Sequence, residues 1–484
     1  MRRVVVVGGG VAGLATALAV SDRARAAGVA LELRVLEGGP RAGGNLRSER
    51  TDGYTVEWGP NGFLDNVPAT LDLVRRIGLE GELQPADAAA ARRFLYRRGR
   101  LHELAPQPLK FLASPVLSVR GRLRVLGEPW TRPKPAGVDE TVHAFAARHI
   151  GEEAAAVLVG AMVSGVFAGD ARSLSLASAF PKMAAMEEAH GSLVRAMLAR
   201  GRERRAAKRR LAELRARGEA APELTRPGGP AGPGGTLTSF GSGIETLIEG
   251  LVAALDREGG AVETGRPALR LERDGARRWR VVADGGEPVE ADAVVVAIPA
   301  APARALVAPL DEGFERALAA IPAAGLAVVA LAYDAAAMGG APAGFGFLAP
   351  RGEGLRILGC LWDSSIFPGR APAGKVLMRA MIGGALDPAA VLLSDEELQT
   401  EVRGDLRRAM HLEAAPERVW IFRHPGGIGQ YTVGHRARLE QIAAAESRNP
   451  GLHLAGQSYY GIAMNACIEK AGPLADSLLA GLAP

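Results

Sequence analysis

Apolar residues gather along this chain in short runs that differ in period. Four valines at 4–7 are followed by a glycine cluster, and then by small apolar residues at helical spacing over 11–20. A short, wholly apolar, β-branched run is typical of a strand buried in a parallel sheet. The pattern predicts a strand at 4–7, a helix at 11–20 and a second strand, LELRVLE, at 31–37.

The same kind of strand returns late in the chain, as ADAVVVAIPA at 291–300 and GLHLAGQS at 451–458, the latter followed by a loop and a final helix. Between them, residues 300–422 alternate strands with Gly/Pro turns, which favours an antiparallel sheet in a second domain. We therefore expect an α/β fold, α+β overall, with a Rossmann-like nucleotide domain and a β-rich domain.

The turn between the first strand and helix has glycines in G-x-G-x-x-G spacing, at Gly8, Gly10 and Gly13. Such glycines let the main chain approach a pyrophosphate, whose charge is met by the positive end of the helix. Glu37, at the end of the next strand, can accept hydrogen bonds from ribose hydroxyls. These features predict a dinucleotide site and leave NAD and FAD open, with a plain strand–turn–helix as the alternative.

Length and composition exclude several classes. A chain of 484 residues with 48% hydrophobic content can form two or three domains, each with its own core. Cys360 and Cys467 lie far apart, so we expect neither a disulfide framework nor a cysteine-based zinc site, and interpret both as core residues in a reducing compartment. The longest uncharged apolar run, 154–169, is too short to span a membrane.

The formal net charge of +5 is concentrated in one basic run at 200–218. Two interpretations stay open for this predicted helix, a solvated face and a surface that meets anionic lipid headgroups. Nucleic acid is disfavoured because no stacking aromatics are interleaved. The Gly/Pro-rich segment at 226–235 that follows predicts a linker and a domain boundary.

A second glycine loop, GGPRAGGNLRS at 38–48, follows Glu37 and contains Arg41, Gly43 and Gly44. An arginine there can reach phosphates, and the glycines let the chain fold back over a bound cofactor. G-x-G-x-x-G, then Glu, then R-x-G-G resembles the amino-terminal signature of flavin oxidases of the monoamine oxidase, phytoene desaturase and protoporphyrinogen oxidase type. The resemblance implies FAD.

Six further stretches resemble protoporphyrinogen oxidases, in order along the chain: 54–70, 92–106, 165–183, 344–350, 429–435 and 458–468. Such enzymes oxidise a porphyrinogen by six electrons in heme biosynthesis, with O2 as acceptor. The flavin N5 accepts the hydride, so we expect no metal and assign no catalytic side chain. Alternatives are coproporphyrinogen III oxidation, a carotenoid desaturase or amine oxidase on the same fold, and a nucleotide-fold escort protein without redox activity.

Residue by residue, the resemblance implies an FAD site along much of the chain. An amine oxidase would commonly carry a flavin-linked cysteine near Cys467, but NACI at 465–468 fits the porphyrinogen pattern better. The expected FAD-binding residues are Gly8, Gly10, Val11, Ala12, Gly13, Glu37, Arg41, Gly43, Gly44, Gly59, Pro60, Asn61, Gly62, Val262, His424, Ile462, Ala463, Met464 and Asn465.

The resemblance also implies a substrate site. Arg93 matches an arginine that pairs with a substrate propionate, with a solvated surface strand as the alternative. Gly165 matches a glycine near the flavin, with an ordinary turn as the alternative. Apolar residues expected against the tetrapyrrole, with core packing as their alternative, are Phe345, Gly346, Leu348, Leu361 and Met381.

Two residues depart from the family pattern. Ala466 stands where aspartate is usual, which puts a hydrogen bond beside the flavin in doubt, and Gly429 replaces a usual proline.

We expect three parts: an FAD domain from 1–88, 235–300 and 425–484, a substrate domain from 89–97, 191–234 and 301–424, and a helical, membrane-associating region at 98–190. An ordinary helical subdomain is the alternative for the last. We expect the chain in the cytoplasm, bound peripherally to the inner face of the cell membrane, with a porphyrinogen and O2 as partners. A homodimer and contact with the next porphyrin-pathway enzyme are further hypotheses.

Overall fold

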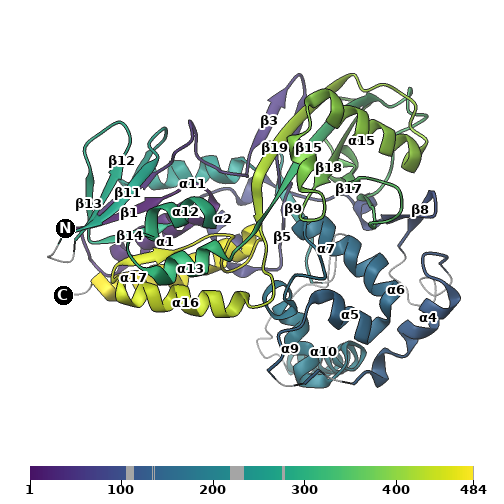
Figure 1. Cartoon of the computed structure of the whole chain (residues 1–484), viewed down its shortest axis with the longest axis horizontal. Coiled ribbons are helices and arrows are strands. Elements are labelled where there is room, and N and C mark those ends of the chain that lie inside the picture. The colour runs from purple at the N-terminus through teal and green to yellow at the C-terminus, as the bar shows by residue number, and fades with distance from the viewer. Residues whose placement is uncertain (105–113, 133, 136, 218–233, 275–277, 483–484) are drawn as a thin grey trace.

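The computed structural model of the chain shows three parts, which lie side by side in Figure 1. It describes residues 1–484 apart from 105–113, 133, 136, 218–233, 275–277 and 483–484. A sheet flanked by helices lies at the left of the view, a second sheet at the upper right and a helical part at the lower right. Within the described ranges, no helix is long and apolar enough to cross a membrane.

Five parallel strands form the first sheet, in the order β10-β2-β1-β14-β20. The beginning, middle and end of the chain therefore meet in one sheet, and the predicted α/β fold is confirmed. The strands are β1 (Arg2–Val7), β2 (Leu31–Leu36), β10 (Ala261–Glu263), β14 (Ala293–Val296) and β20 (Leu452–Leu454).

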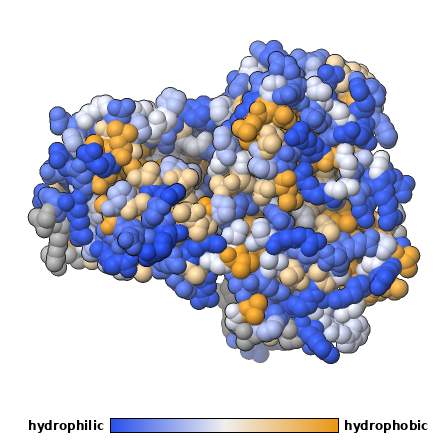
Figure 2. Space-filling model, viewed as in Figure 1, coloured by the Kyte–Doolittle hydropathy of each residue, from blue (hydrophilic) through white to orange (hydrophobic). Residues whose placement is uncertain are grey.

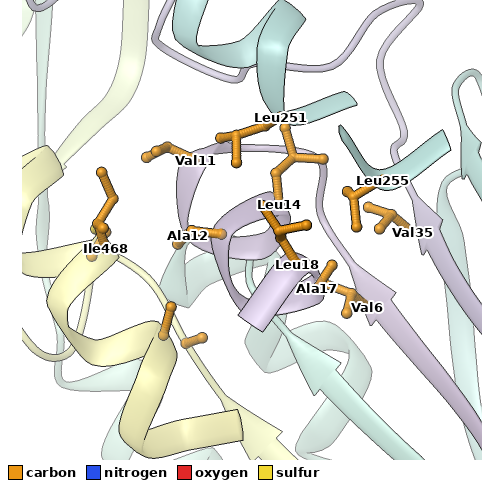
Figure 3. Close-up of a cluster of buried hydrophobic side chains, with 14 of the residues drawn as sticks. Val6, Val11, Ala12, Leu14, Ala17, Leu18, Val35, Leu251, Leu255 and Ile468 are labelled. Carbon is orange, nitrogen blue, oxygen red and sulfur yellow. The ribbon is translucent and has the colours of Figure 1, made fainter. Parts of the chain in front are cut away.

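Both faces of this sheet are covered, which explains the uninterrupted valines of β1. Successive strand residues point to opposite faces, so Val4 and Val6 join one apolar cluster while Val5 and Val7 join another. Figure 3 shows the first cluster, where Leu255 of α11 and residues of α1 lie near Val6 and Val35, while Ile468 of α17 faces Val11 and Ala12 of α1. One cover comprises α1 (Val11–Ala26), α2 (Pro68–Arg76), α11 (Thr246–Arg257) and α17 (Met464–Leu482). The other comprises α12 (Ala300–Val307), α13 (Glu312–Ala319), α16 (His435–Arg448), β11 (Ala268–Arg273), β12 (Trp279–Ala283) and β13 (Val289–Ala291).

Seven strands form the second sheet, in the order β19-β15-β18-β17-β16-β7-β8. Neighbours are antiparallel except β16 and β7, so the expected antiparallel sheet is mixed, because β7 enters from far earlier in the chain. Helix α15 (Asp395–Met410) packs on one face through Leu398, Val402 and Leu406. The strands are β7 (Arg93–Arg97), β8 (Arg100–Glu103), β15 (Ala323–Asp334), β16 (Gly346–Leu348), β17 (Ile357–Leu361), β18 (Lys375–Gly383) and β19 (Arg418–Gly429).

The helical part lies beneath the second sheet in Figure 1. Residues 98–103 were expected within it, but they form a hairpin turn and β8 of the sheet, because β8 pairs with β7. Its elements are α4 (Val119–Leu126), η3 (Glu128–Trp130), α5 (Val142–Ile150), α6 (Glu152–Ala154), the π-helical turn η4 (Ala155–Val159), α7 (Gly160–Phe167), α8 (Leu176–Ala179), α9 (Pro181–His190) and α10 (Leu193–Ala216).

Helix α10 is the predicted basic helix, and its place corrects our expectation that 191–234 joins the substrate domain. It packs against α9 and η3 instead. The buried carboxylate of Glu128 accepts the main-chain N–H groups of Leu193 and Val194 and the hydroxyl of Ser192, at 2.7–3.1 Å. A buried carboxylate needs such partners, and those at the start of α10 hold the helix here. The predicted boundary at 226–235 lies outside the described residues up to 233.

Short elements join the two large sheets. They are the hairpin β3 (Ser48–Thr51) and β4 (Tyr54–Glu57), and the small sheet β5 (Phe63–Leu64), β9 (Leu237–Phe240) and β6 (Leu83–Pro85). Single turns are α14 (Asp363–Ile366), η1 (Glu80–Glu82), η2 (Ala88–Ala91) and η5 (Pro388–Leu392). Residues 58–62 run from β4 to β5 and form the connection that matters for the site.

Candidate functional site

The turn between β1 and α1 requires a glycine at position 13 and faces open space at position 10. A Cβ on Gly13 would lie 2.0 Å from the carbonyl oxygen of Gly8, while a Cβ on Gly10 would meet nothing within 4 Å. Gly10 is the N-cap of α1 without a side-chain cap, and the first turn holds no acidic residue. The free N–H groups of Val11 and Ala12 are thus available to an anion.

Glu37 braces this turn. Its carboxylate accepts the N–H of Gly9 at 2.7 Å and that of Gly39 at 2.6 Å. We expected the carboxylate to face ribose, and two carboxylate oxygens have about four acceptor positions, so two are left. Val262 lies on the neighbouring edge strand β10, where it is paired with Val35 of β2.

The second glycine loop lies directly against the first. Gly43 donates its N–H to Gly9 at 2.8 Å, and Gly43 and Gly44 have φ values of +121° and +58°. Arg41 lies in the same loop, but its guanidinium pairs with Glu245 at 3.2 Å and lies over the ring of Trp58. The loop thus lies against the first glycine turn, while its arginine contacts protein groups.

A third set of predicted residues lies between the two sheets. A Cβ on Gly59 would lie 2.8 Å from the carbonyl oxygen of Asn45, and one on Gly62 would lie 2.5 Å from that of Thr238. Pro60 stands between them, and Asn61 donates to Asp363 at 3.3 Å. Steric limits at both glycines fix the path of this segment.

The carboxyl-terminal residues reach the same region. Met464 begins α17, and Asn465 accepts from Thr70 at 2.9 Å and donates to the carbonyl of Leu64 at 2.8 Å. His424 is hydrogen-bonded to the carbonyl of Trp58 at 2.9 Å, and burial lowers the pKa of its imidazole. Ile462 packs near α7, and Ala463 is exposed.

The predicted substrate residues share one face of the second sheet. Strand pairing places Arg93 opposite Gly346, Gly346 opposite Leu361, and Leu361 opposite Arg379. We call these four residues the cross-strand row. Residues opposite each other point to the same side, the side away from α15.

A second row runs parallel to the first. Leu348 is opposite Gly359, and Gly359 is opposite Met381. Gly165 of α7 packs against it, since a Cβ on Gly165 would lie 2.4 Å from Cδ2 of Leu348. The structure therefore brings Gly165, Leu348 and Met381 to this face.

Arg93 differs from its neighbour Arg92. Arg92 is exposed and pairs with Glu103 at 2.9 Å. The guanidinium of Arg93 lies 4.9 Å from the ring centre of Phe345, and burial lowers its pKa. Within the described part of the chain, no carboxylate pairs with Arg93. It is a half-buried cation available to an anionic ligand.

Sequence reasoning missed a set of buried groups around the site. Arg379 and Asp363 form a fully buried ion pair, Arg370 pairs with Glu57 at 3.2 Å, and Tyr431 accepts the N–H of Gly461 at 2.7 Å. Arg379 carried a visible signal, since it is a lone charge inside the apolar strand KVLMRAMIGG. Such a charge is buried only when it is paired.

A pocket of about 250 Å³ opens between α1, α16 and α17. Its lining includes Ala12, Glu446, Gly456, Ala466 and Lys470. Ala466, the position where aspartate is usual, therefore borders open space.

Residues 11–479 match the family described as Flavin containing amine oxidoreductase. The chain belongs to this family, and with it to the class of FAD-dependent oxidoreductases. The glycine turns fit this cofactor, since a Cβ at Gly8 or Gly13 would meet neighbouring main-chain oxygens at 2.7 and 2.0 Å.

Within the family, protoporphyrinogen oxidase from Bos taurus is 35% identical over 99% of this chain and 98% of its own length. The protein of that name from Homo sapiens is 34% identical over the same shares. Coproporphyrinogen III oxidase from Bacillus subtilis is 28% identical over 97% and 96%. The chain is a member of the protoporphyrinogen oxidase group.

Solved structures agree on the fold. A crystal structure from Exiguobacterium sp. 255-15, described provisionally as a protoporphyrinogen oxidase, matches with a TM-score of 0.81 and 26% identity, over 99% of this chain and 98% of its own. Reduced UDP-galactopyranose mutase matches with a TM-score of 0.71 at 16% identity, over 100% and 96%, which shows the shared fold.

Proposed function

We propose that this chain oxidises protoporphyrinogen IX to protoporphyrin IX. Six electrons and six protons pass to three O2, which leave as three H2O2. The observation that carries the proposal is the cross-strand row, which has an available cation, Arg93, at one end and Arg379, bound to the segment 57–59, at the other.

The row suits a flat ligand with carboxylates on one edge. Three strand spacings of about 4.8 Å separate the two arginine backbones, a distance of about 14 Å. Arg93 can hold a propionate through two parallel hydrogen bonds. A tetrapyrrole lying across the row would then reach the residues expected around the flavin.

Apolar residues of this face would exclude water from the ring. Phe345 and Leu361 share one apolar cluster, and Leu348 and Met381 form the second row. Gly165 leaves α7 close to that row. FAD, when bound, supplies hydride acceptance at N5 and reoxidation by O2. The side chains of this chain bind and orient the substrate and keep the site dry.

The expected FAD contacts are proposed in two groups that the second glycine loop joins. Gly8–Gly13, Glu37 and Val262 would bind the adenine dinucleotide end. Residues 59–62, His424 and residues 462–465 would surround the isoalloxazine. Arg41, Gly43 and Gly44 would lie between the two groups, along the phosphates and ribityl chain.

Porphyrin fluorescence in air tests the substrate assignment. The purified yellow protein should release porphyrin faster from protoporphyrinogen than from coproporphyrinogen, and faster than a blank without protein. Coproporphyrinogen III is the second candidate, because the Bacillus subtilis relative that covers nearly the whole chain bears that activity in its name. Faster coproporphyrin release would select it, and a rate equal to the blank for both substrates would refute both.

We also propose that the helical part binds the inner face of the cell membrane. Val119, Leu123 and Leu126 of α4 and Trp130 of η3 follow helical spacing, and all four are exposed, Trp130 by 77%. Basic residues such as Arg120 and Arg124 alternate with them. Figure 2 shows apolar patches on an otherwise hydrophilic helical part. An apolar stripe flanked by arginines is the pattern of an interfacial helix.

Sedimentation with vesicles containing anionic lipid tests this surface. Replacing Val119, Leu123 and Trp130 by Ser should abolish sedimentation with vesicles and leave FAD content unchanged. Equal sedimentation of the variant and the wild type would place the membrane contact elsewhere. The homodimer and the contact with the next pathway enzyme stay predictions.

A further inference from the structure

The guanidinium of Arg379 donates four hydrogen bonds to protein groups. Arg379 is 2% exposed, and Nη1 donates to the carbonyls of Glu57 at 2.9 Å and Gly59 at 2.7 Å. Nη2 donates to Asp363 at 3.1 Å, and Nε donates to its second carboxylate oxygen. The arginine of β18 thus binds the main-chain carbonyl at the end of β4 and that of Gly59 in the connection between β4 and β5.

Asp363 adds a hydrogen bond to the same connection. Its carboxylate is 2% exposed and accepts the side-chain amide of Asn61 at 3.3 Å. One buried ion pair therefore fixes the carbonyl of Gly59 and the amide of Asn61 together. These are two of the residues expected along the isoalloxazine.

Stability alone is a poor reason for this pair. Apolar residues of similar volume usually replace a buried ion pair without loss of stability, because desolvation offsets the charge attraction. Apolar residues cannot fix the orientation of main-chain carbonyls, because they donate no hydrogen bonds. A planar guanidinium sets the angles of several hydrogen bonds at once. The pair is suited to fixing orientation.

Arg379 links these hydrogen bonds to the proposed substrate site through its place on the second sheet. It is the last residue of the cross-strand row, opposite Leu361, which is opposite Gly346, which is opposite Arg93. The strand that would carry one end of the substrate site therefore also holds the segment beside the flavin. A shift of β18 would move both.

We propose that Arg379 and Asp363 are positioning residues that set the distance between the isoalloxazine and the substrate. This inference rests on the proposed function for the identity of the substrate. Hydride transfer needs the reacting atoms about 3–3.5 Å apart, and a displacement of about 1 Å can lower the rate about 100-fold. Neither residue needs to touch substrate or flavin to have this effect.

The test compares the wild type with Arg379→Met/Asp363→Leu, which removes both charges and leaves neither partner alone. The control, Arg356→Met/Asp387→Leu, removes a partly exposed ion pair of 2.8 Å from the same part of the chain, away from residues 57–61, although Arg356 also pairs with Glu401. For each protein we would measure melting temperature, FAD per chain, the visible circular dichroism of the bound flavin, its reduction potential, and kcat and KM per bound FAD.

The double variant should keep its fold and change the flavin dichroism and potential, with kcat per bound FAD falling about 10- to 100-fold and KM little altered. The control pair should change none of these. Arg379→Lys, which keeps the charge and loses the planar fork, should fall between wild type and double variant. Flavin signals and kcat equal to the wild type would overturn the proposal, even if the variant were less stable.

Failure of the proposed function would look different. Wild-type protein that is yellow but oxidises neither porphyrinogen would refute the substrate, while the flavin dichroism and potential would still decide the role of Arg379. If the double variant does not fold, Asn61→Ala serves instead, since it removes the side-chain amide that donates a hydrogen bond to Asp363. An unchanged flavin spectrum in both Asn61→Ala and Arg379→Lys would overturn the proposal.

Discussion

The nucleotide turn and the substrate face are built in different ways. In the turn, main-chain atoms of Gly8 to Gly13 and of Gly43 define the space, and these residues belong to two short glycine motifs near the start of the chain. On the substrate face, side chains from four strands meet through strand register, from Arg93 of β7 to Met381 of β18. A site made by the main chain is visible in a short motif, whereas a site made by side chains depends on the whole sheet.

The largest expected effect tests the main-chain side of this comparison. Gly13→Ala places a Cβ 2.0 Å from the carbonyl oxygen of Gly8, and neither atom belongs to a flexible side chain. Overpacking of about 1–3 kcal/mol should lower FAD affinity about 10- to 100-fold. Visible flavin absorbance per chain measures the loss. Gly404→Ala, in α15 with open space around it, is the control, and normal FAD content in Gly13→Ala would contradict the assignment of the turn.

Arg93→Ala tests the side-chain side. Losing a charge-assisted hydrogen bond of about 1.5–3 kcal/mol should raise KM about 10- to 100-fold, with kcat and FAD content retained. Steady-state porphyrin fluorescence measures both constants. Arg92→Ala is the matched control, because its exposed side chain pairs with Glu103. A variant that loses flavin instead would make Arg93 a structural residue.

Gly165→Ala tests a contact between a main-chain glycine and a substrate-face side chain, since the glycine of α7 makes room for a side chain of β16. The new Cβ would lie 2.4 Å from Cδ2 of Leu348, which can rotate away. We expect a penalty of about 1 kcal/mol and a roughly fivefold rise in KM. Leu348→Ala in the same chain should remove the clash, so that a double-mutant cycle shows coupling. Additive effects would place the two residues out of contact.

The smallest effect on FAD binding and activity concerns a side chain behind the nucleotide turn, which should act on stability alone. Burial raises the pKa of Glu446 to about 7, although its carboxylate accepts the N–H of Leu454 at 2.6 Å. The folded state binds the proton more tightly than the unfolded state, so stability is highest below about pH 4.5 and falls as the pH rises to about 7.

Glu446→Gln keeps a neutral acceptor at every pH. Between about pH 5 and about pH 8 the stability of the variant relative to the wild type should therefore rise by about 1–3 kcal/mol. The melting temperature of the variant should rise relative to that of the wild type over the same range. Thermal unfolding at both pH values measures the difference. A constant difference would mean that Glu446 titrates normally.

The sequence predicted the parallel sheet and its glycine turns because both depend on local pattern. It did not place α10, since the partner of that helix, Glu128, lies far away in an unremarkable segment. Nor could it separate Arg92 from Arg93, which the hairpin β7–β8 and its pairing with β16 distinguish. The sequence showed one member of the buried pair, Arg379, as a charge in an apolar strand. Only the fold identifies Asp363 as its partner.

The division of the parallel sheet along the chain has a consequence for synthesis. β1 and α1 leave the ribosome first, but α17, which packs against α1 and begins beside the expected isoalloxazine, leaves last. Domains generally fold as units, and contacts distant in sequence form slowly. The first half of the nucleotide turn must therefore wait, with apolar surface on α1 uncovered, until nearly the whole chain has been made. Cofactor capture then becomes a late event, and a protein truncated before residue 464 should emerge without flavin.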